Sequence, residues 1–248
     1  LNRLSPADTM AFFQDNGLPL KVERGNRVFP VSDNANDVAG LLDRLCRRRG
    51  VRVLHGKALE ICADQGAVTG VSTDQGLIQC RAAALCTGGL SYPLTGSDGT
   101  GYAMAEKLGH SVTGLRPSLV PLESGDGYCG EMQGFALKNV TLSAYENNRL
   151  IYKELGEMLF THFGVSGPLV LSASSHMRNM GSAEYRLEID LKPGLDEKKL
   201  DARLLRDFEK YSNREFKNAL GDLAGRAMIP VLIRLSGIPE DTKVNSIT

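Results

Sequence analysis

The sequence has neither a net charge nor a long apolar run. It holds 29 Lys and Arg residues against 29 Asp and Glu residues among 248. A protein that coats nucleic acid or an anionic membrane needs a dominant positive field, which this balance does not supply. No apolar stretch approaches the roughly 18–20 residues of a membrane span. We therefore expect a small-molecule substrate, with no nucleic-acid partner and no membrane partner, while the oligomeric state stays open.

The sequence also has few residues arranged for metal binding or export. None of its five cysteines forms a C-x-x-C pair, and none of its four histidines forms an H-x-x-x-H pair. An odd number of cysteines without such spacing favours reduced, mostly buried thiols in a cytosolic protein. No signal-peptide pattern is present at the N-terminus. We expect a cytoplasmic protein without a metal site.

The two ends of the sequence lack the marks of a complete chain. It begins at Leu1 without a Met, and Val244–Thr248 resembles the start of an element. At about 150 residues per domain, the length corresponds to one large or two modest domains. We expect an excised piece of a longer protein.

The first 116 residues show an α/β pattern. The run Ser5-Pro6-Ala7-Asp8 predicts a helix that begins with a capping box and extends to about Asn16. Either Asp33 or Asn34 caps a second helix. The other expected elements are a hairpin at Lys21–Pro30, a short buried strand at Val51–Leu54, a meander over 57–81, a strand at Ala82–Cys86 and a helix at Tyr102–Leu108.

The remainder divides into a β-rich zone and a helical zone. We expect domain boundaries that give 1–116, 117–193 and 194–248. The predicted strands are Leu137–Ala144, Arg149–Tyr152, Met158–Phe160 and Tyr185–Leu191, with one helix from Ser166-Gly167-Pro168 to about Met180. The predicted helices of the last zone are about Glu197–Tyr211, Arg214–Leu223 and Met228–Leu235.

The strand that ends in Thr87-Gly88-Gly89 is the most informative feature of the first zone. A meander followed by such a strand is typical of the second half of an FAD-binding doubly wound domain, where the cofactor lies across the carboxyl ends of the strands. Glycine lets a backbone approach a cofactor closely, although a tight turn requires glycine as well. The strand–Gly-x-Gly-x-x-Gly–helix unit that holds a pyrophosphate is absent from these 248 residues. Gly96–Gly101 is either a phosphate cradle or, as we favour, a turn and helix cap.

Four motifs in series indicate a family. They are Arg24-Gly25-Asn26-Arg27-Val28-Phe29-Pro30, Cys86-Thr87-Gly88-Gly89-Leu90-Ser91-Tyr92-Pro93, Leu115-Arg116-Pro117-Ser118-Leu119-Val120-Pro121-Leu122 and Gly156-Glu157-Met158-Leu159-Phe160-Thr161-His162-Phe163-Gly164-Val165-Ser166-Gly167-Pro168. Together they resemble a bacterial flavoprotein family labelled aminoacetone-oxidase-like or 3-dehydro-bile-acid reductase-like. The resemblance covers essentially the whole chain in order.

The resemblance implies an α/β fold with inserts: a partial FAD-binding doubly wound domain, a β-barrel-like insert and a helical insert. It also implies an oxidoreductase in which NAD(P)H reduces a bound FAD, and the flavin passes hydride to an unsaturated ketone such as a steroid or bile acid. Members of this family carry an N-terminal glycine-rich unit and a C-terminal return segment, and neither is present. The loop departs from one common version of the family at Asp98 and Thr100, which leaves the roles of these two side chains open.

Five residues are candidates for the site. By the resemblance, Thr87, Gly88 and Gly89 contact FAD, and Ala58 presents backbone to the adenine; the alternatives are a tight turn and a plain meander residue. His162 follows a strand and precedes a Gly-rich turn, where a neutral imidazole would orient substrate or relay a proton, unless it is structural.

Two further residues each have alternative roles. Arg27, in the hairpin with Phe29-Pro30, either faces flavin or substrate or is an exposed hairpin residue. Ser166 is expected to cap a helix, because Pro168 replaces the last glycine of a nucleophile elbow.

Two other functions remain open. One is a catalytically silent structural fragment that binds FAD weakly or not at all, because it lacks the pyrophosphate-binding unit. The other is a binding module, since small β-barrels also bind RNA. The basic surface with interleaved aromatics that RNA binding would need is not evident in the sequence.

Overall fold

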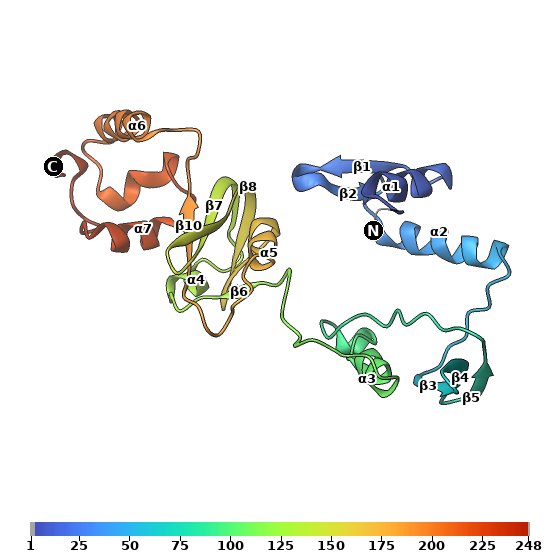
Figure 1. Cartoon of the computed structure of the whole chain (residues 1–248). Helices are drawn as coiled ribbons and strands as arrows, with labels where there is room; N and C mark the ends of the chain where they lie inside the picture. The colour runs from blue at the N-terminus through green and yellow to red at the C-terminus, as the bar shows by residue number, and fades with distance from the viewer. Residues whose placement is uncertain (1–2, 248) are drawn as a thin grey trace. The chain divides into compact units, whose positions relative to one another are not determined.

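The computed structural model describes residues 3–247 and contains two compact units, Leu1–Leu115 and Arg116–Thr248 (Figure 1). Leu1, Asn2 and Thr248 lie outside the described residues, so the expectation based on the chain ends is not addressed there. Val244–Ser246, part of the expected final element, forms a single 3₁₀ turn.

The first unit combines helices with two small antiparallel sheets. β1 pairs with β2, and a separate sheet has the order β3-β4-β5. The elements are α1 (Pro6–Asp15), β1 (Leu20–Glu23), β2 (Arg27–Pro30), α2 (Ala35–Arg48), β3 (Ala58–Asp64), β4 (Ala67–Thr73), β5 (Gly76–Gln79) and α3 (Thr100–Lys107), with 3₁₀ turns at Arg24–Asn26 and Pro93–Thr95.

Local sequence signals account for most of these elements. The Ser5 side chain accepts a hydrogen bond from the Asp8 N–H, and the Asp8 carboxylate accepts one from the Ser5 N–H, which confirms the capping box of α1. Of the two candidates for the start of α2, Asn34 is the N-cap. The predicted hairpin and meander are confirmed.

The two strands expected to belong to a parallel sheet are not formed. Residues 51–54 and 82–86 adopt no regular structure, and Val53 is 61% exposed. An apolar strand of a parallel sheet is stable when neighbouring strands pair with it and cover both faces. Within residues 3–115 no strand pairs with either segment. The prediction of a buried strand at Val51–Leu54 and of a strand at Ala82–Cys86 is therefore wrong for this structure.

The second unit is built on a curled five-stranded antiparallel sheet. Its strand order is β10-β7-β8-β9-β6, and β10 and β6 are not paired, so the sheet forms part of a barrel. The elements are β6 (Leu122–Glu123), α4 (Tyr128–Glu131), β7 (Ala136–Glu146), β8 (Arg149–Thr161), β9 (Gly164–Ser166), α5 (Pro168–Ser174), β10 (Tyr185–Asp190), α6 (Glu197–Lys210) and α7 (Ile229–Ser236), with 3₁₀ turns at Phe216–Asn218 and Leu220–Asp222.

One strand of this sheet is longer than its sequence predicts. The expected pair of strands at 149–152 and 158–160 is a single strand, β8. The polar residues between them keep their backbone in register with β7, with Lys153 opposite Ser143 and Glu154 opposite Leu142. Exposed polar side chains therefore do not interrupt the ladder.

The helix after β9 starts and ends differently from its prediction. Ser166 is the last residue of β9 rather than an N-cap, and Gly167, with φ 94°, precedes α5. A Cβ at Gly167 would lie 2.9 Å from the Met158 Cα, so this close approach requires glycine. The helix ends at Ser174 instead of Met180; the hydroxyls of Ser174 and Ser175 donate to carbonyls three residues earlier, which competes with helix continuation.

The predicted helix over Arg214–Leu223 is also wrong. Two 3₁₀ turns occupy this segment, because the Phe216 N–H donates to the Thr242 carbonyl and the Lys217 N–H donates to the Glu240 carbonyl. These bonds to the C-terminal segment replace the regular bonds of an α-helix.

The core of the second unit joins the sheet to the last helix. Leu142, Met158 and Val170 are buried between the sheet and α5, and Figure 1 shows α5 lying against β8. Met228 and Val231 extend the same core towards α7, and Arg234 of α7 forms two hydrogen bonds to the Glu131 carboxylate at 2.9 and 3.1 Å. The expected boundary between residues 193 and 194 stays a prediction.

Candidate functional site

The Thr87-Gly88-Gly89 segment forms an open turn in the first unit. Thr87 and Gly88 are exposed, and Gly88 has φ 74°, in the left-handed region that favours glycine. Among the described residues, no acceptor is bonded to the N–H groups of Thr87, Gly88 and Gly89 or to the Thr87 hydroxyl. The turn therefore presents free donors along bare backbone.

The Gly96–Gly101 loop supports this turn from the side. A Cβ at Gly88 would lie 2.7 Å from the Ser97 Oγ, and a Cβ at Gly101 would overlap the Thr87 hydroxyl. The Tyr102 hydroxyl lies 3.4 Å from the position of a Cβ at Gly89. Two glycine-rich segments that are separated by residues 90–95 are thus packed closely, and their glycines are needed for that packing.

The loop itself is a turn and helix cap, as favoured from the sequence. The Asp98 Oδ1 accepts hydrogen bonds from the Thr100 hydroxyl at 2.7 Å and from the Thr100 N–H at 3.1 Å. The hydrogen bond from the Thr100 side chain is the main cause that lowers the pKa of Asp98. The Asp98 carboxylate places a negative charge at the start of α3, where a bound phosphate would otherwise place one. Asp98 and Thr100 therefore stabilise the structure of this loop.

Ala58 begins β3 and is half-buried opposite Thr73 of β4. The residue before it, Lys57, donates its backbone N–H to the Asp74 carboxylate at 3.0 Å. The Lys57 ammonium also helps to lower the pKa of Asp98 through space, so the start of β3 lies in the electrostatic reach of the loop. No contact between Ala58 and the Thr87 turn is described, and the predicted role of Ala58 stays a prediction.

The turn fits one part of FAD. A cofactor rich in phosphate and hydroxyl oxygens can accept hydrogen bonds from three free backbone N–H groups, and glycine permits a close approach. The Thr87 hydroxyl, which packs against Gly101, is a fourth donor in the same segment. Thr87, Gly88 and Gly89 are the residues that would hold the cofactor, and their predicted role stays a prediction.

His162 lies in the second unit, in the turn between β8 and β9. Its ring is exposed and meets the Phe163 ring edge-on, with centroids 4.9 Å apart. The turn is fixed by the Ser124 N–H, which donates to the Phe163 carbonyl at 3.0 Å, and by Gly164, where a Cβ would overlap the Leu122 carbonyl. The neighbouring Thr161 hydroxyl is buried without a described hydrogen-bond partner. The imidazole is accessible to a substrate on a rigid support, and its catalytic role stays a prediction.

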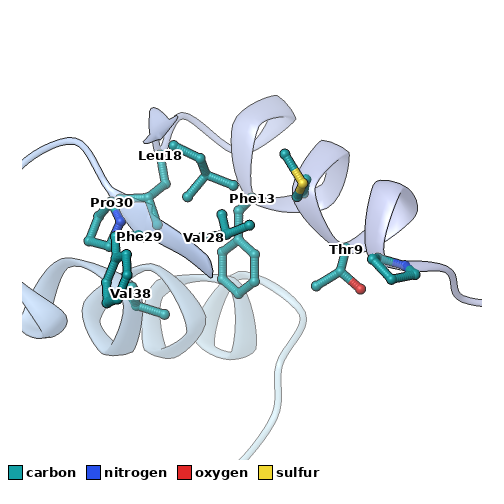
Figure 2. A pocket seen from close by; sticks show the side chains of 10 residues that line it. Thr9, Phe13, Leu18, Val28, Phe29, Pro30 and Val38 are labelled. Atoms are coloured by element: carbon teal, nitrogen blue, oxygen red, sulfur yellow. The ribbon is translucent and has the colours of Figure 1, made fainter. Parts of the chain in front are cut away.

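An apolar pocket that the sequence did not reveal lies between α1, the hairpin and α2. Its volume is about 340 Å³, and Figure 2 shows side chains that converge on it from all three elements. It is lined by Pro6, Thr9, Met10, Phe13, Leu18, Leu20, Val28, Phe29, Pro30 and Val38. Arg27 lies over the Phe29 ring at 5.7 Å from its centroid. The Val28-Phe29-Pro30 part of the hairpin motif therefore lines a cavity, and only the helical spacing of Met10 and Phe13 hinted at this.

Neither metal ligands nor disulfides contribute to a site in residues 3–247. No three His, Cys, Asp or Glu side chains of this range gather as metal ligands, and all five cysteines are free. Burial raises the pKa of the Cys129 thiol and raises the pKa of Tyr128 to about 12. No helix within this range is long and apolar enough to cross a membrane.

The family model for the HI0933-like protein barrel and H2TH domain matches residues 116–248, more than half of the chain. Its barrel and helical parts agree with the curled sheet and the helices of the second unit. The chain belongs to the HI0933-like family of flavoproteins, which confirms the family indicated by the four motifs.

Three curated relatives extend this comparison. The chain is 26% identical over 243 residues to a 3-dehydro-bile acid delta(4,6)-reductase of Clostridium scindens, which covers 97% of this chain and 59% of the relative. It is 30% identical over 211 residues to the ribosomal RNA dihydrouridine synthase of Escherichia coli K12; the match covers 84% of this chain and 50% of the relative. The enzyme of the same name from Haemophilus influenzae is 29% identical over 199 residues; the match covers 78% of this chain and 47% of the relative. The chain thus spans about half the length of the relatives it matches.

Proposed function

We propose that this chain is part of an FAD-dependent oxidoreductase that reduces a carbon–carbon double bond conjugated to a carbonyl group. The observation that carries the proposal is the kind of reaction that the relatives' names describe. A 3-dehydro-bile acid with double bonds at positions 4 and 6 is a conjugated dienone. Dihydrouridine is uridine whose ring double bond, conjugated to a carbonyl, has been saturated. Both substrates are electron-poor alkenes that accept a hydride and a proton.

The residues of the chain would divide the work as follows. FAD, when bound and reduced by NAD(P)H, supplies the hydride. Thr87, Gly88 and Gly89 hold acceptor oxygens of the cofactor through their free N–H groups and the Thr87 hydroxyl. His162, exposed on its fixed turn, orients the carbonyl of the substrate or delivers the proton.

The first substrate candidate is a small unsaturated ketone of steroid or bile-acid type. The relative that covers 97% of this chain is named for such a substrate. The apolar pocket of about 340 Å³ supports it, because ligand pockets begin at about 300 Å³ and are lined mainly by apolar and aromatic side chains.

The second candidate is uridine within ribosomal RNA. Two relatives at 30% and 29% identity carry the name of an enzyme that forms dihydrouridine there. This candidate needs the same chemistry at the double bond and differs in how the substrate is held.

The experiment is an anaerobic reduction assay with the full-length protein that carries this chain, loaded with FAD and supplied with NADH or NADPH. The substrates are a 3-oxo-4,6-diene steroid and an unmodified ribosomal RNA transcript, and mass spectrometry detects the gain of two hydrogens. We expect one of the two to be reduced. If neither is reduced while the flavin is still reduced by the nicotinamide, the proposed function is wrong.

A matched variant tests His162. We expect His162→Ala to lower kcat by about 10²- to 10⁴-fold, the usual contribution of a general acid, with FAD content unchanged. Phe163→Leu removes the ring partner but keeps an apolar side chain, and serves as control. Unchanged steady-state reduction and flavin reoxidation in His162→Ala would remove this residue from the site.

A further inference from the structure

One side of α6 carries an unbroken line of cations. Lys199, Arg203, Arg206 and Lys210 are separated by four, three and four residues. At about 100° per residue they fall within an arc of about 60° and extend along about 16 Å of the helix. The side chains of Lys199 and Lys210 are 68% and 59% exposed, and Arg206 is exposed as well. Arg203 is half-buried, with its guanidinium bonded to the Asp207 carboxylate and to the Asp222 carbonyl. The exposed cations of this line are therefore Lys199, Arg206 and Lys210.

This line of cations continues beyond the end of the helix. The Lys210 ammonium and the Arg214 guanidinium each lie 4.6 Å from the centroid of the Tyr211 ring. Lys243 donates to the Asn213 carbonyl at 3.0 Å, which brings a further cation to the same helix end. We call these residues, Lys199, Arg203, Arg206, Lys210, Tyr211, Arg214 and Lys243, the α6 basic surface.

Carboxylates pair with only part of this surface. Asp196 lies 3.1 Å from Lys199, Asp207 lies 2.9 Å from Arg203, and Asp222 lies 2.7 Å from Lys210. Among residues 3–247, these three carboxylates form ion pairs with three of the six cations. Ion pairs at exposed sites contribute little and are screened by salt, so a ligand with several closely spaced negative charges can exchange with them.

We propose that the α6 basic surface docks on the phosphate backbone of folded ribosomal RNA. The proposal rests on the second substrate candidate, because two relatives are named for a reaction on ribosomal RNA. A nucleic acid presents negative charges at short, regular intervals, and a line of Lys and Arg on a rigid helix complements such a row. The contacts carry no sequence information; they position the RNA while other residues select the uridine.

The test measures binding of the full-length protein to a folded ribosomal RNA transcript over a series of salt concentrations. We expect Arg206→Glu/Arg214→Glu to weaken binding at least about 10-fold near 0.1 M salt and to lower the slope of log K against log salt by about 2, since each lost phosphate contact removes about 0.9. Arg206→Gln/Arg214→Gln should give a smaller loss in the same direction.

Lys198→Glu is the matched control. Lys198 is exposed on the same helix but points about 100° away from Lys199. Lys198→Glu therefore changes the net charge as much as each single Arg→Glu substitution does, but it leaves the α6 basic surface unchanged. Equal weakening by Lys198→Glu would overturn the proposal, as would unchanged binding in both double variants. Tighter binding to vesicles of anionic phospholipid than to RNA, lost in the same double variants, would also overturn it by assigning the surface to a membrane.

The outcome for docking is separable from the outcome for catalysis. If RNA binds through this surface but gains no hydrogens, the docking stands and the uridine candidate fails. If the uridine is reduced while both double variants bind RNA like the wild type, the docking fails and the proposed function stands.

Discussion

The contact between Gly101 and Thr87 is the most constrained feature at the scale of single residues. The Thr87 hydroxyl occupies the place where a side chain at 101 would begin, and the Thr87 Cβ is only 3.3 Å from it. A tight approach of the Thr87 side chain to the backbone of residue 101, rather than a positive φ, therefore dictates glycine here. The same approach lies beside the turn with the free N–H groups, so a change at residue 101 would also alter the proposed cofactor contacts.

We predict that Gly101→Ala weakens FAD binding to the full-length protein and lowers its free energy of unfolding by about 1–3 kcal/mol, the usual cost of overpacking. FAD titration and urea unfolding measure the two effects. Gly114→Ala is the control, because no atom lies within 4 Å of its added Cβ. Thr87→Ala removes the overlapping hydroxyl, so the Thr87→Ala/Gly101→Ala double variant should lose less than the sum of the singles. Equal effects of Gly101→Ala and Gly114→Ala would contradict the packing argument.

At the scale of elements, β10 is held to β7 by a partly exposed polar connection as well as by its ladder. The Glu146 carboxylate accepts a hydrogen bond from the Tyr185 hydroxyl at 2.8 Å and another from the Asn179 side chain at 2.8 Å. These two bonds, that of Tyr185 first, lower the pKa of Glu146 from its usual value of 4.5. The carboxylate form thus fastens the start of β10 and the segment after α5 to the end of β7.

We predict a stability loss in acid that depends on Glu146. Because its folded pKa lies below the unfolded value, the stabilisation is fully present above about pH 4.5 and is lost as the pH falls through the folded pKa. Glu146→Gln should be less stable at pH 7 and should lose less stability on acidification. Urea midpoints between about pH 7 and pH 3 measure this. Glu157→Gln, at an exposed position of β8, should keep the wild-type pH profile, and a Glu146→Gln profile parallel to the wild type would refute the assignment.

Sequence signals predicted elements whose hydrogen bonds close locally. The α1 capping box, the β1–β2 hairpin and the three-stranded meander have turn and cap residues that specify them within a few positions. The strand predictions for Val51–Leu54 and Ala82–Cys86 are wrong, because apolar residues alone do not form a strand without a pairing neighbour. The helix prediction for residues 214–223 is wrong, because the carbonyls of Glu240 and Thr242, far along the chain, accept hydrogen bonds from N–H groups of this segment.

The candidate site shows the same limit. The glycines at 88, 89 and 101 are visible in the sequence, but their mutual packing joins segments that are separated along the chain and could not be inferred from spacing. The pocket between α1, the hairpin and α2 depends in the same way on how three elements meet. The basic line on α6 obeys helical periodicity. The positions of Arg214 beside Tyr211 and of Lys243 beside Asn213 depend instead on the irregular chain that follows.

At the scale of the whole molecule, the two units differ in how many apolar residues they bury. Of the apolar residues other than glycine that are buried among the described ones, only Leu18, Pro30, Leu41 and Met104 belong to the first unit. The second unit has a continuous core between its sheet, α5 and α7, and a smaller one around Phe216 and Leu220. Since burial of apolar surface is the main source of stability, the second unit accounts for most of the stability of this chain.

The turn that we propose to bind the cofactor lies in the unit with less core, and this gives a prediction for the chain of residues 1–248 by itself. The free N–H groups at 87–89 can hold part of FAD, but the sequence has no Gly-x-Gly-x-x-Gly unit for the pyrophosphate. A pyrophosphate without that helix N-terminus loses several charge-assisted hydrogen bonds, and any binding must also order a unit with little core. We therefore expect residues 1–248 to be catalytically silent and to lose FAD on gel filtration, while the full-length protein retains it. A visible flavin spectrum at one FAD per chain after gel filtration of residues 1–248 would show that the Thr87 turn and its neighbours suffice.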